Sequence, residues 1–323
     1  MVRYVIRRLL WAVVLFIAVT VVTYLIFFLI PVDPARLAAG KSATPAEVKA
    51  VAHRLYLDRP VYEQYLHFLG QLVLHGSLGY SFNDRQSVNS SIFAAAPVTI
   101  SLVLGGAVVW MLIAVPVGIL SALKPRSILD RCAMVGVLGG ISAHPVWIGL
   151  VDSYIFGYRL GVLPIQGYCN LRGAAPGQIC GGPADWFTHM LMPWIVFAVL
   201  YSAFYVRMIR ANVMETLNED YVRTARAKGA PESLVLRRHV LRNAMLPVVT
   251  MLGMDIAIAL GGAVLIETVF GLPGLGYLAI QSVQQFDLPK IIGVTVFASV
   301  MVILFNLLVD LLYAWIDPRI RLA

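Results

Sequence analysis

Cys169 and Cys180 are the residues of this sequence best spaced to react with each other. They flank a loop rich in glycine and proline, within the stretch GYCNLRGAAPGQICGG. In an oxidising compartment two such thiols can close a disulfide. A metal site is the weaker alternative, because two thiols without a nearby histidine or a second thiol pair supply too few ligands. The sequence therefore predicts a disulfide and no metal site.

Enzyme chemistry finds little support in the sequence. It contains neither HExxH nor GxSxG, and its six histidines are scattered. Gly40, Lys41 and Ser42 resemble the end of a phosphate-binding loop, but Ala35 occupies the position of the leading glycine. We therefore expect no catalytic residue, no nucleotide site and no cofactor bound by this chain.

Three acidic residues, Asp255, Glu267 and Asp152, lie within or at the ends of apolar runs. A carboxylate in lipid is costly unless it faces a cavity or a partner, so each is a candidate for a translocation pathway. On a helix, Asp255 lies about 200° from Gly253 and so points away from that small-residue face. Asp255 could instead pair with a neighbouring subunit, and the other two could anchor the ends of spans.

The elements that carry these residues are membrane helices. A mean hydropathy of +0.80 with 13% charged residues is not the composition of a soluble globular chain. Leu9 to Ile30 stays apolar without a signal-peptide cleavage site, and at about 1.5 Å per residue it covers about 33 Å, enough for one crossing. Five further long runs follow, near Val98 to Leu123, Met134 to Phe156, Met190 to Met208, Leu246 to Phe270 and Ile291 to Ile316. Because barrel strands are much shorter, we predict an all-α integral membrane protein with six transmembrane helices.

Basic residues predict the orientation. Of the 25 lysines and arginines, most lie before the first span, at residues 124–131, at residues 207–242 and after the last span. Such residues mark the cytoplasmic side, so both termini are predicted to be cytoplasmic. The net charge of +8 is then a signal of topology, and no nucleic-acid partner is expected. The predicted organisation is an N-terminal segment with the first span (1–31), an external helical region (32–97), a five-helix core (98–318) with a cytoplasmic loop (209–246), and a cytoplasmic tail (319–323).

The external region is predicted to be ordered. Thr44 and Glu47 form a capping box around Pro45, and a second helix is expected from Pro60. Apolar residues recur in it every four positions from Val61, so it must pack on the spans or lie at the lipid interface. Packing on the spans is the simpler interpretation.

The loop between the fourth and fifth spans has a distinct pattern. No glycine or proline occurs from Trp194 to Lys228, which predicts one helix continuing from the membrane into the cytosol. Its apolar positions recur every four residues through Tyr221, and Glu219 is spaced to pair with Arg223. Gly229 then fits a left-handed cap and Pro231 the start of a short helix. A solvated basic loop would satisfy topology alone, whereas a rigid elbow can transmit movement.

This segment resembles the cytoplasmic coupling loop of ATP-binding-cassette importer permeases. Arg223, Thr224 and Ala225 occupy the Glu-Ala-Ala positions of that loop, Gly229 its glycine, and Leu246 with Pro247 its closing pair. The acidic residue is missing, and RTARAKG in its place is similar to the dipeptide and oligopeptide subgroup. The stretch from Pro31 to Phe82 and the stretch ETVFGLPGLG (267–276) also resemble that subgroup, although Val32, Tyr56 and Ser77 depart from its pattern.

The resemblance implies a permease subunit with the type I importer fold in the bacterial inner membrane. Its implied partners are a second, homologous permease, two cytoplasmic ATPases that carry ATP and Mg²⁺, an external solute-binding protein and the lipid membrane. The residues implied to contact an ATPase are Arg223, Thr224, Ala225, Gly229, Ala230, Pro231, Glu232, Ser233, Leu234 and Arg238. On the pathway, Asp255 could meet the amino end of a peptide. A self-contained channel or ion-coupled carrier is the alternative, and the sequence leaves the cargo open among dipeptides, longer peptides, glutathione, haem and nickel chelates.

Overall fold

The computed structural model describes residues 2–29, 34–40, 43–54, 56–173, 180–261 and 263–316. The predicted tail (319–323), residues 31–33 at the first boundary, and Lys41 and Ser42 lie outside this part of the chain. The elements in chain order are α1 (Val2–Leu29), α2 (Pro34–Ala39), α3 (Pro45–Arg54), α4 (Val61–His75), α5 (Val88–Leu123), α6 (Ile128–Ser142), α7 (Pro145–Asp152), the π-helix η1 (Ser153–Arg159), α8 (Pro183–Leu217), α9 (Asp220–Ala227), α10 (Glu232–Leu234), the π-helix η2 (Val235–Leu241), α11 (Arg242–Ala244), α12 (Leu246–Leu260), α13 (Val264–Phe270), α14 (Leu275–Gln284) and α15 (Leu288–Ile316).

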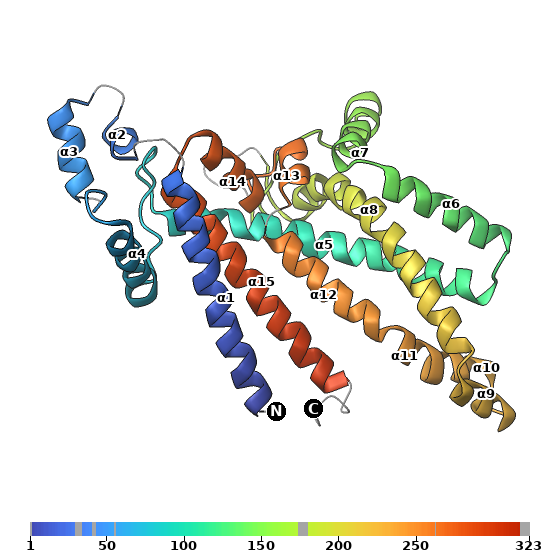
Figure 1. Cartoon of the computed structure of the whole chain (residues 1–323). Coiled ribbons are helices and arrows are strands. Elements are labelled where there is room, and N and C mark those ends of the chain that lie inside the picture. The colour runs from blue at the N-terminus through green and yellow to red at the C-terminus, as the bar shows by residue number, and fades with distance from the viewer. Residues whose placement is uncertain are drawn as a thin grey trace.

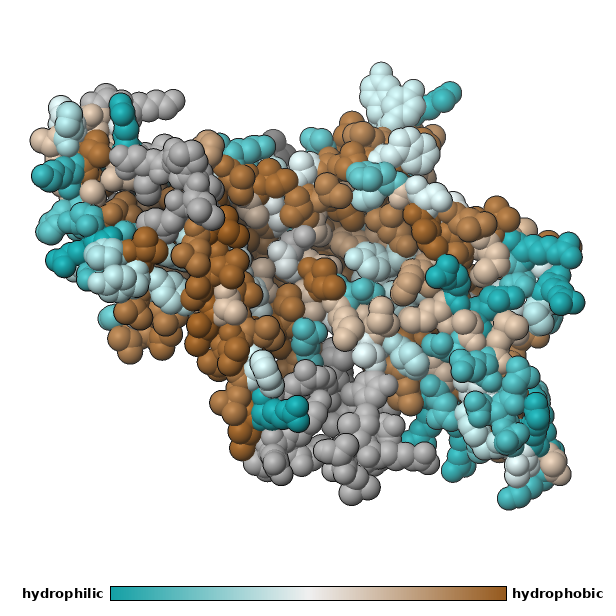
Figure 2. Space-filling view, in the orientation of Figure 1, coloured by the Kyte–Doolittle hydropathy of each residue, from teal (hydrophilic) through white to brown (hydrophobic). Residues whose placement is uncertain are grey.

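Long apolar helices dominate the structure, as predicted. Among the described residues, α1, α5, α8 and α15 are each long and apolar enough to cross a membrane, and three bent helix pairs raise the number of possible spans to seven. Figure 1 shows the start of α1 and the end of α15 at the same end of the molecule as α9 and α10, with α2 to α4, α13 and α14 toward the other end. Hydrophilic residues gather over α9 to α11 and over α3, and hydrophobic residues cover much of the surface between them (Figure 2).

Two of the predicted spans are broken. The third was expected to be continuous, but α6 and the α7–η1 helix meet at 104°, because Pro145 starts a new helix whose N-cap is His144. The fifth was expected to run from Leu246 to Phe270, but α12 ends at Leu260 and α13 begins at Val264. Gly261 is the C-cap of α12, and glycine lowers helix stability.

Helix α5 starts earlier than the apolar run predicted, so the expected boundary between residues 97 and 98 falls inside it. Pro97 is accommodated within the helix. The first turns persist because they are buried: Val88 and Ile92 form a small core with Leu275 of α14 and Val294 of α15. Burial against distant segments therefore decides where this helix begins.

Helices α5 and α8 form the centre of the fold. Gly105 of α5 lies so close to Trp194 of α8 that an added Cβ would be 2.2 Å from the indole ring. Next to this contact, Trp110 is fully buried and its ring stacks on Tyr201 with centroids 4.5 Å apart. The indole of Trp194 fills the space that a side chain at position 105 would occupy, and its Nε1 donates to Ser101 O of α5 at 3.1 Å, so a small residue is needed here for α5 and α8 to pack.

The region between α1 and α5 is ordered and packs on α1. The predicted capping box is present, because Thr44 N donates to Glu47 Oε2 at 2.7 Å and Glu47 N to Thr44 Oγ1 at 3.4 Å. On α4, Tyr65 Oη lies 2.9 Å from Thr20 Oγ1 of α1, and its ring meets that of Tyr24 edge to face. The part of α4 around Tyr65 therefore packs on the first span, whereas Val73 of the same predicted stripe is 69% exposed.

A polar clamp joins the loop before α5 to the start of α15. Asp287 is fully buried and accepts hydrogen bonds from Ser81 Oγ and, at 3.2 Å, from Phe82 N. Lys290 Nζ donates to Asp84 Oδ2 at 2.5 Å and lies 3.7 Å from Asp287 Oδ2. The clamp holds together segments about 200 residues apart in the chain, at the end of the molecule opposite the termini.

Acid should weaken this clamp. Desolvation raises the pKa of Asp84, but hydrogen bonds from Lys290 and Ser81 lower it by more, so the folded-state pKa lies below its ordinary value. The contribution of Asp84 to stability is then present above about pH 4 and is lost as the pH falls through the folded-state pKa. We expect the thermal unfolding midpoint of the purified chain to fall below about pH 4, and to fall less in Asp84→Asn. Asp220→Asn is the control, since that side chain is 98% exposed; equal acid sensitivity of wild type and Asp84→Asn would contradict the assignment.

Candidate functional site

The elbow, defined here as residues 218–244, projects from the end of α8. Helix α8 stops at Leu217, α9 follows after a break at Asn218 and Glu219, and the chain turns at Gly229 before α10 begins. Gly229 has φ +78°, a conformation that favours glycine, and Pro231 is the N-cap of α10. The predicted helix, turn and short helix is therefore present in the structure, at the lower right of Figure 1.

The buried side chains of the elbow are part of the main hydrophobic core. Val222 of α9 and Val235 and Val240 of η2 are fully buried. Burying a valine contributes about 1.5 kcal/mol or more to stability. These three side chains therefore contribute most of the energy that holds α9 and η2 together. Across the turn, Arg226 donates to Glu232 at 3.1 and 2.6 Å, which raises the pKa of Arg226. Because this ion pair is exposed, it contributes little to stability. Its role is to set the angle between α9 and α10.

The register within the elbow differs from the prediction. Because α8 ends at Leu217 and Glu219 is the extended N-cap of α9, a single helix through Lys228 does not form. The break moves the buried position from Tyr221, which is 41% exposed, to Val222. The expected ion pair between Glu219 and Arg223 is not formed; Arg223 lies 3.6 Å from Asp220 instead.

Most residues predicted to contact an ATPase lie on the outer surface of the elbow. Ala225 and Ala230 are only partly exposed and pack toward the core. Leu234 is an apolar side chain near the tip of the elbow and is 43% exposed. The exposed members are Arg223, Thr224, Gly229, Pro231, Glu232, Ser233, Leu234 and Arg238. They form a basic surface around one apolar side chain, which is suited to contact another protein.

A buried ion pair, not foreseen from the sequence, ties α6 to α8 close to the elbow. Arg210 of α8 donates to both oxygens of Asp130, at 2.7 and 3.1 Å. Asp130 also accepts from Ser121 Oγ of α5 and, at 2.8 Å, from Arg126 N. The available signal was local: Ser127 caps α6, and Asp130 is the acidic residue of its first turn. This cluster fixes the α5–α6 turn on the stretch of α8 that leads to the elbow.

Removing the arginine of this pair should be costly, since it leaves a buried carboxylate without its charged partner. We expect Arg210→Met to lower the thermal unfolding midpoint by several degrees. Arg207→Met, a change at an exposed arginine on the same helix, should alter it by less than about 2 °C. Equal midpoints for the two variants would show that the pair does not hold α6 to α8.

The structure places the three predicted pathway carboxylates on three different elements. Asp255 of α12 is half-buried, and its Oδ2 accepts from Tyr205 Oη of α8 at 2.6 Å. Tyr205 is itself fully buried. Asp255 therefore points toward α8, away from the face of Gly253. Its carboxyl group has a hydrogen-bond partner within its own chain.

Glu267 is an anchor of the fold and does not line an open path. It is fully buried, and it accepts from Thr99 Oγ1 of α5 at 2.7 Å and from Tyr277 N of α14 at 2.9 Å. A Cβ on Gly274 would lie 2.4 Å from its carboxyl carbon, so glycine is required there. The carboxylate joins the α13–α14 turn to α5, in agreement with the anchoring alternative.

One carboxylate oxygen of Asp152 accepts no hydrogen bond from the described residues. It ends α7 and is half-buried, and its buried Oδ2 has no hydrogen-bond partner among the described residues. The same is true of the hydroxyl of Ser153 at the start of η1. Buried polar groups are nearly always paired, so these two atoms point to a polar partner outside the described chain.

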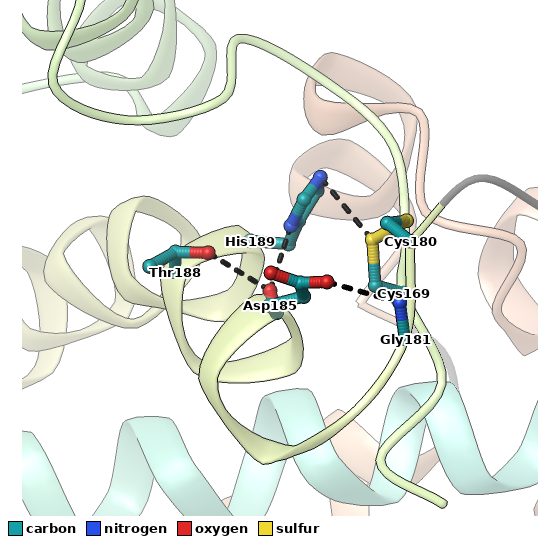
Figure 3. The surroundings of a disulfide bond; sticks show 6 residues. All are labelled: Cys169, Cys180, Gly181, Asp185, Thr188 and His189. Atoms are coloured by element: carbon teal, nitrogen blue, oxygen red, sulfur yellow. Dashed lines mark hydrogen bonds between the residues drawn. A yellow bond between two sulfur atoms is a disulfide. The ribbon is translucent and has the colours of Figure 1, made fainter. Parts of the chain in front are cut away.

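Cys169 and Cys180 are joined in a disulfide, with Cα atoms 5.5 Å apart. The third cysteine, Cys132, is free and exposed on α6. His189 of α8 folds back to the bridge and places Nε2 at 3.5 Å from Cys169 Sγ (Figure 3). The expectation that no histidine lies near the two cysteines is therefore wrong, because the fold brings His189 next to Cys169.

Comparisons with known proteins agree with this architecture. The sequence profile of the binding-protein-dependent transport system inner membrane component family matches residues 114–322, and the profile of the N-terminal membrane component of such systems matches residues 1–103. A Brucella suis (strain 1330) protein named as a peptide permease is 40% identical over 326 residues, covering 100% of both chains. The glutathione transport system permease protein of Pectobacterium atrosepticum is 38% identical over 321 residues, covering 99% of both chains. A solved amino acid ABC transporter with bound histidines has a TM-score of 0.53 at 16% identity, covers 70% of this chain and 94% of its own, and shares the fold.

Proposed function

Because the chain belongs to the family of binding-protein-dependent transport system inner membrane components, we propose that it is one permease subunit of an ATP-driven importer of di- or oligopeptides. The observation that carries the proposal is the elbow, which combines buried valines with an exposed surface at the end of the molecule where α1 begins and α15 ends. A transmembrane core without a motor needs such an attachment point. The family supports this reading and gives no support to a self-contained channel or ion-coupled carrier.

In the proposed assembly the chain has six spans, both termini are cytoplasmic and the membrane is the bacterial inner membrane. A second, homologous permease completes the path, two cytoplasmic ATPases bind ATP and Mg²⁺, and an external solute-binding protein delivers the cargo. The distribution of basic residues supports the orientation, because it places the elbow on the cytoplasmic side. The chain itself supplies the path and no hydrolytic residue.

Coupling would proceed through the elbow to α8. An ATPase that moves the exposed surface around Leu234 would move α9 and η2 together, because the buried valines join them. Helix α8 follows directly, and Arg210 with Asp130 would pass the displacement to α6. Packed helices move as units, so a small shift at the elbow can switch the spans between two arrangements.

Changes at the elbow surface test the proposal. We expect Leu234→Asp and Gly229→Trp to insert normally into the membrane and to abolish ATP-dependent uptake and ATP hydrolysis by the complex. Leu234→Met keeps the apolar surface and should transport at nearly the wild-type rate. The readouts are uptake into proteoliposomes that contain the whole complex and protease mapping of topology. Normal uptake by both disruptive variants would remove the elbow from coupling.

A peptide cargo is proposed because the two relatives are named for a peptide and for glutathione, and because Asp255 offers a carboxylate within an apolar span. A carboxylate at that depth can receive the ammonium group of a passing peptide. The hydrogen bond from Tyr205 positions this carboxyl group.

Asp255→Asn should therefore lower dipeptide uptake by about tenfold, the scale of one lost hydrogen bond to a charged group. Tyr205→Phe keeps the carboxylate and removes only its internal partner, so it should retain more uptake than Asp255→Asn. Both are measured in the assembled complex with the binding protein in excess. Equal uptake by wild type and Asp255→Asn would exclude this residue from the path and would leave the role of the elbow intact.

A further inference from the structure

The region around the disulfide contains a third ligand-forming atom. The sulfur atoms of Cys169 and Cys180 and one nitrogen of His189 all lie within 4.8 Å of one another. Cys169 is fully buried, and the other two side chains are half-buried, so the cluster is sheltered but open on one side. Figure 3 shows His189 reaching toward the bridge from the first turns of α8.

The orientation of His189 is fixed by its other nitrogen. Nδ1 lies 2.7 Å from the carbonyl oxygen of Asp185, which can only accept, so Nδ1 carries the proton. Nε2 is then the nitrogen with the free electron pair, and it faces Cys169 Sγ at 3.5 Å. A histidine that donates one N–H to a carbonyl and aims its other nitrogen at neighbouring donor atoms has the arrangement usual for metal-binding histidines.

The backbone keeps the two cysteines close independently of the bond between them. Their chain neighbours Asn170 and Gly181 are paired in a β-bridge, and Gly182 N donates to Asn170 O at 2.9 Å. Asp185 also accepts from Gly181 N at 3.0 Å, which ties this strand to the start of α8. Breaking the disulfide would therefore leave two thiols and one imidazole facing a common point.

We infer that the reduced form of this cluster is a binding site for a thiophilic metal ion of the Zn²⁺ class, held by Cys169, Cys180 and His189. Two sulfurs and one imidazole nitrogen are preferred ligands of Zn²⁺, and they exclude Mg²⁺ and Ca²⁺. On tetrahedral zinc such atoms lie about 3.5–3.8 Å apart, a spacing that the sulfur and nitrogen already have. The fourth position would remain open to water.

Reduction of the disulfide between Cys169 and Cys180 requires a reductant, here a dithiol. Its two electrons and two protons convert the disulfide to two thiols, and its own sulfurs form a disulfide. Zn²⁺ then displaces two protons from the thiols and takes the electron pair of Nε2. The same two sulfurs serve either the covalent bond or the metal, so the two states exclude each other. The site does not depend on what the chain transports.

Metal titration of the full-length, tag-free chain tests this inference. The chain is reduced with a phosphine, desalted under argon and titrated with Co²⁺ as a spectroscopic substitute for Zn²⁺. We expect one Co²⁺ per chain with a thiolate-to-cobalt charge-transfer band, displacement by Zn²⁺, and no band in the oxidised chain. Circular dichroism of the oxidised and reduced samples must agree, so that loss of folding on reduction is not read as metal binding.

Variants separate the site from adventitious binding. Cys180→Ser should abolish the band, and His189→Gln should weaken Co²⁺ binding by about tenfold or more. Cys132→Ser removes the exposed cysteine of α6 and should leave binding unchanged. Zn²⁺ should also protect Cys169 and Cys180 of the reduced chain from alkylation, and less so in His189→Gln. A band that persists in Cys180→Ser, equal binding by the oxidised chain, or no binding after reduction would each overturn the inference.

Discussion

The close contact between α5 and α8 is the interaction on which the rest of the structure depends. Gly105 leaves room for the indole ring of Trp194, and each helix also carries polar groups that hold other elements in place. From α5, Thr99 binds Glu267 and so the α13–α14 turn. From α8, Tyr205 binds Asp255 of α12 and Arg210 binds Asp130 of α6. Since lipid offers no hydrogen bonds, these internal partners are what make each buried charge tolerable.

The same pair of helices connects the two ends of the molecule. Helix α8 begins beside the disulfide and His189 and ends at the elbow. An element of this length, packed against α5 along much of its course, is well suited to carry a displacement from one side of a membrane to the other. The polar clamp of Asp287 and Lys290 adds a second fixed point, where α15 meets the start of α5.

The pathway carboxylates show how far reasoning from a membrane sequence reaches. An intramembrane carboxylate needs either a polar partner or a cavity, and this holds for all three residues. The sequence does not tell which carboxylate has a partner and which faces a cavity. The Glu267 carboxylate accepts two hydrogen bonds within the chain, Asp255 accepts one, and Asp152 Oδ2 has no partner among the described residues. The difference depends on residues more than a hundred positions away for Glu267 and fifty for Asp255. Spacing along one helix carries no record of such partners.

The sequence alone determined the class of protein, the helical spans, the capping box at Thr44 and the turn at Gly229, because hydropathy, caps and glycine conformations act within a few residues. Only the tertiary structure decided where α5 begins, that α12 and α13 are separate helices, which residue of α9 is buried and which carboxylates are paired. It alone brought His189 to Cys169, twenty residues back along the chain. The physical reason is that burial and hydrogen bonding between distant segments are properties of the packed molecule, and their energies outweigh local preference wherever the two compete.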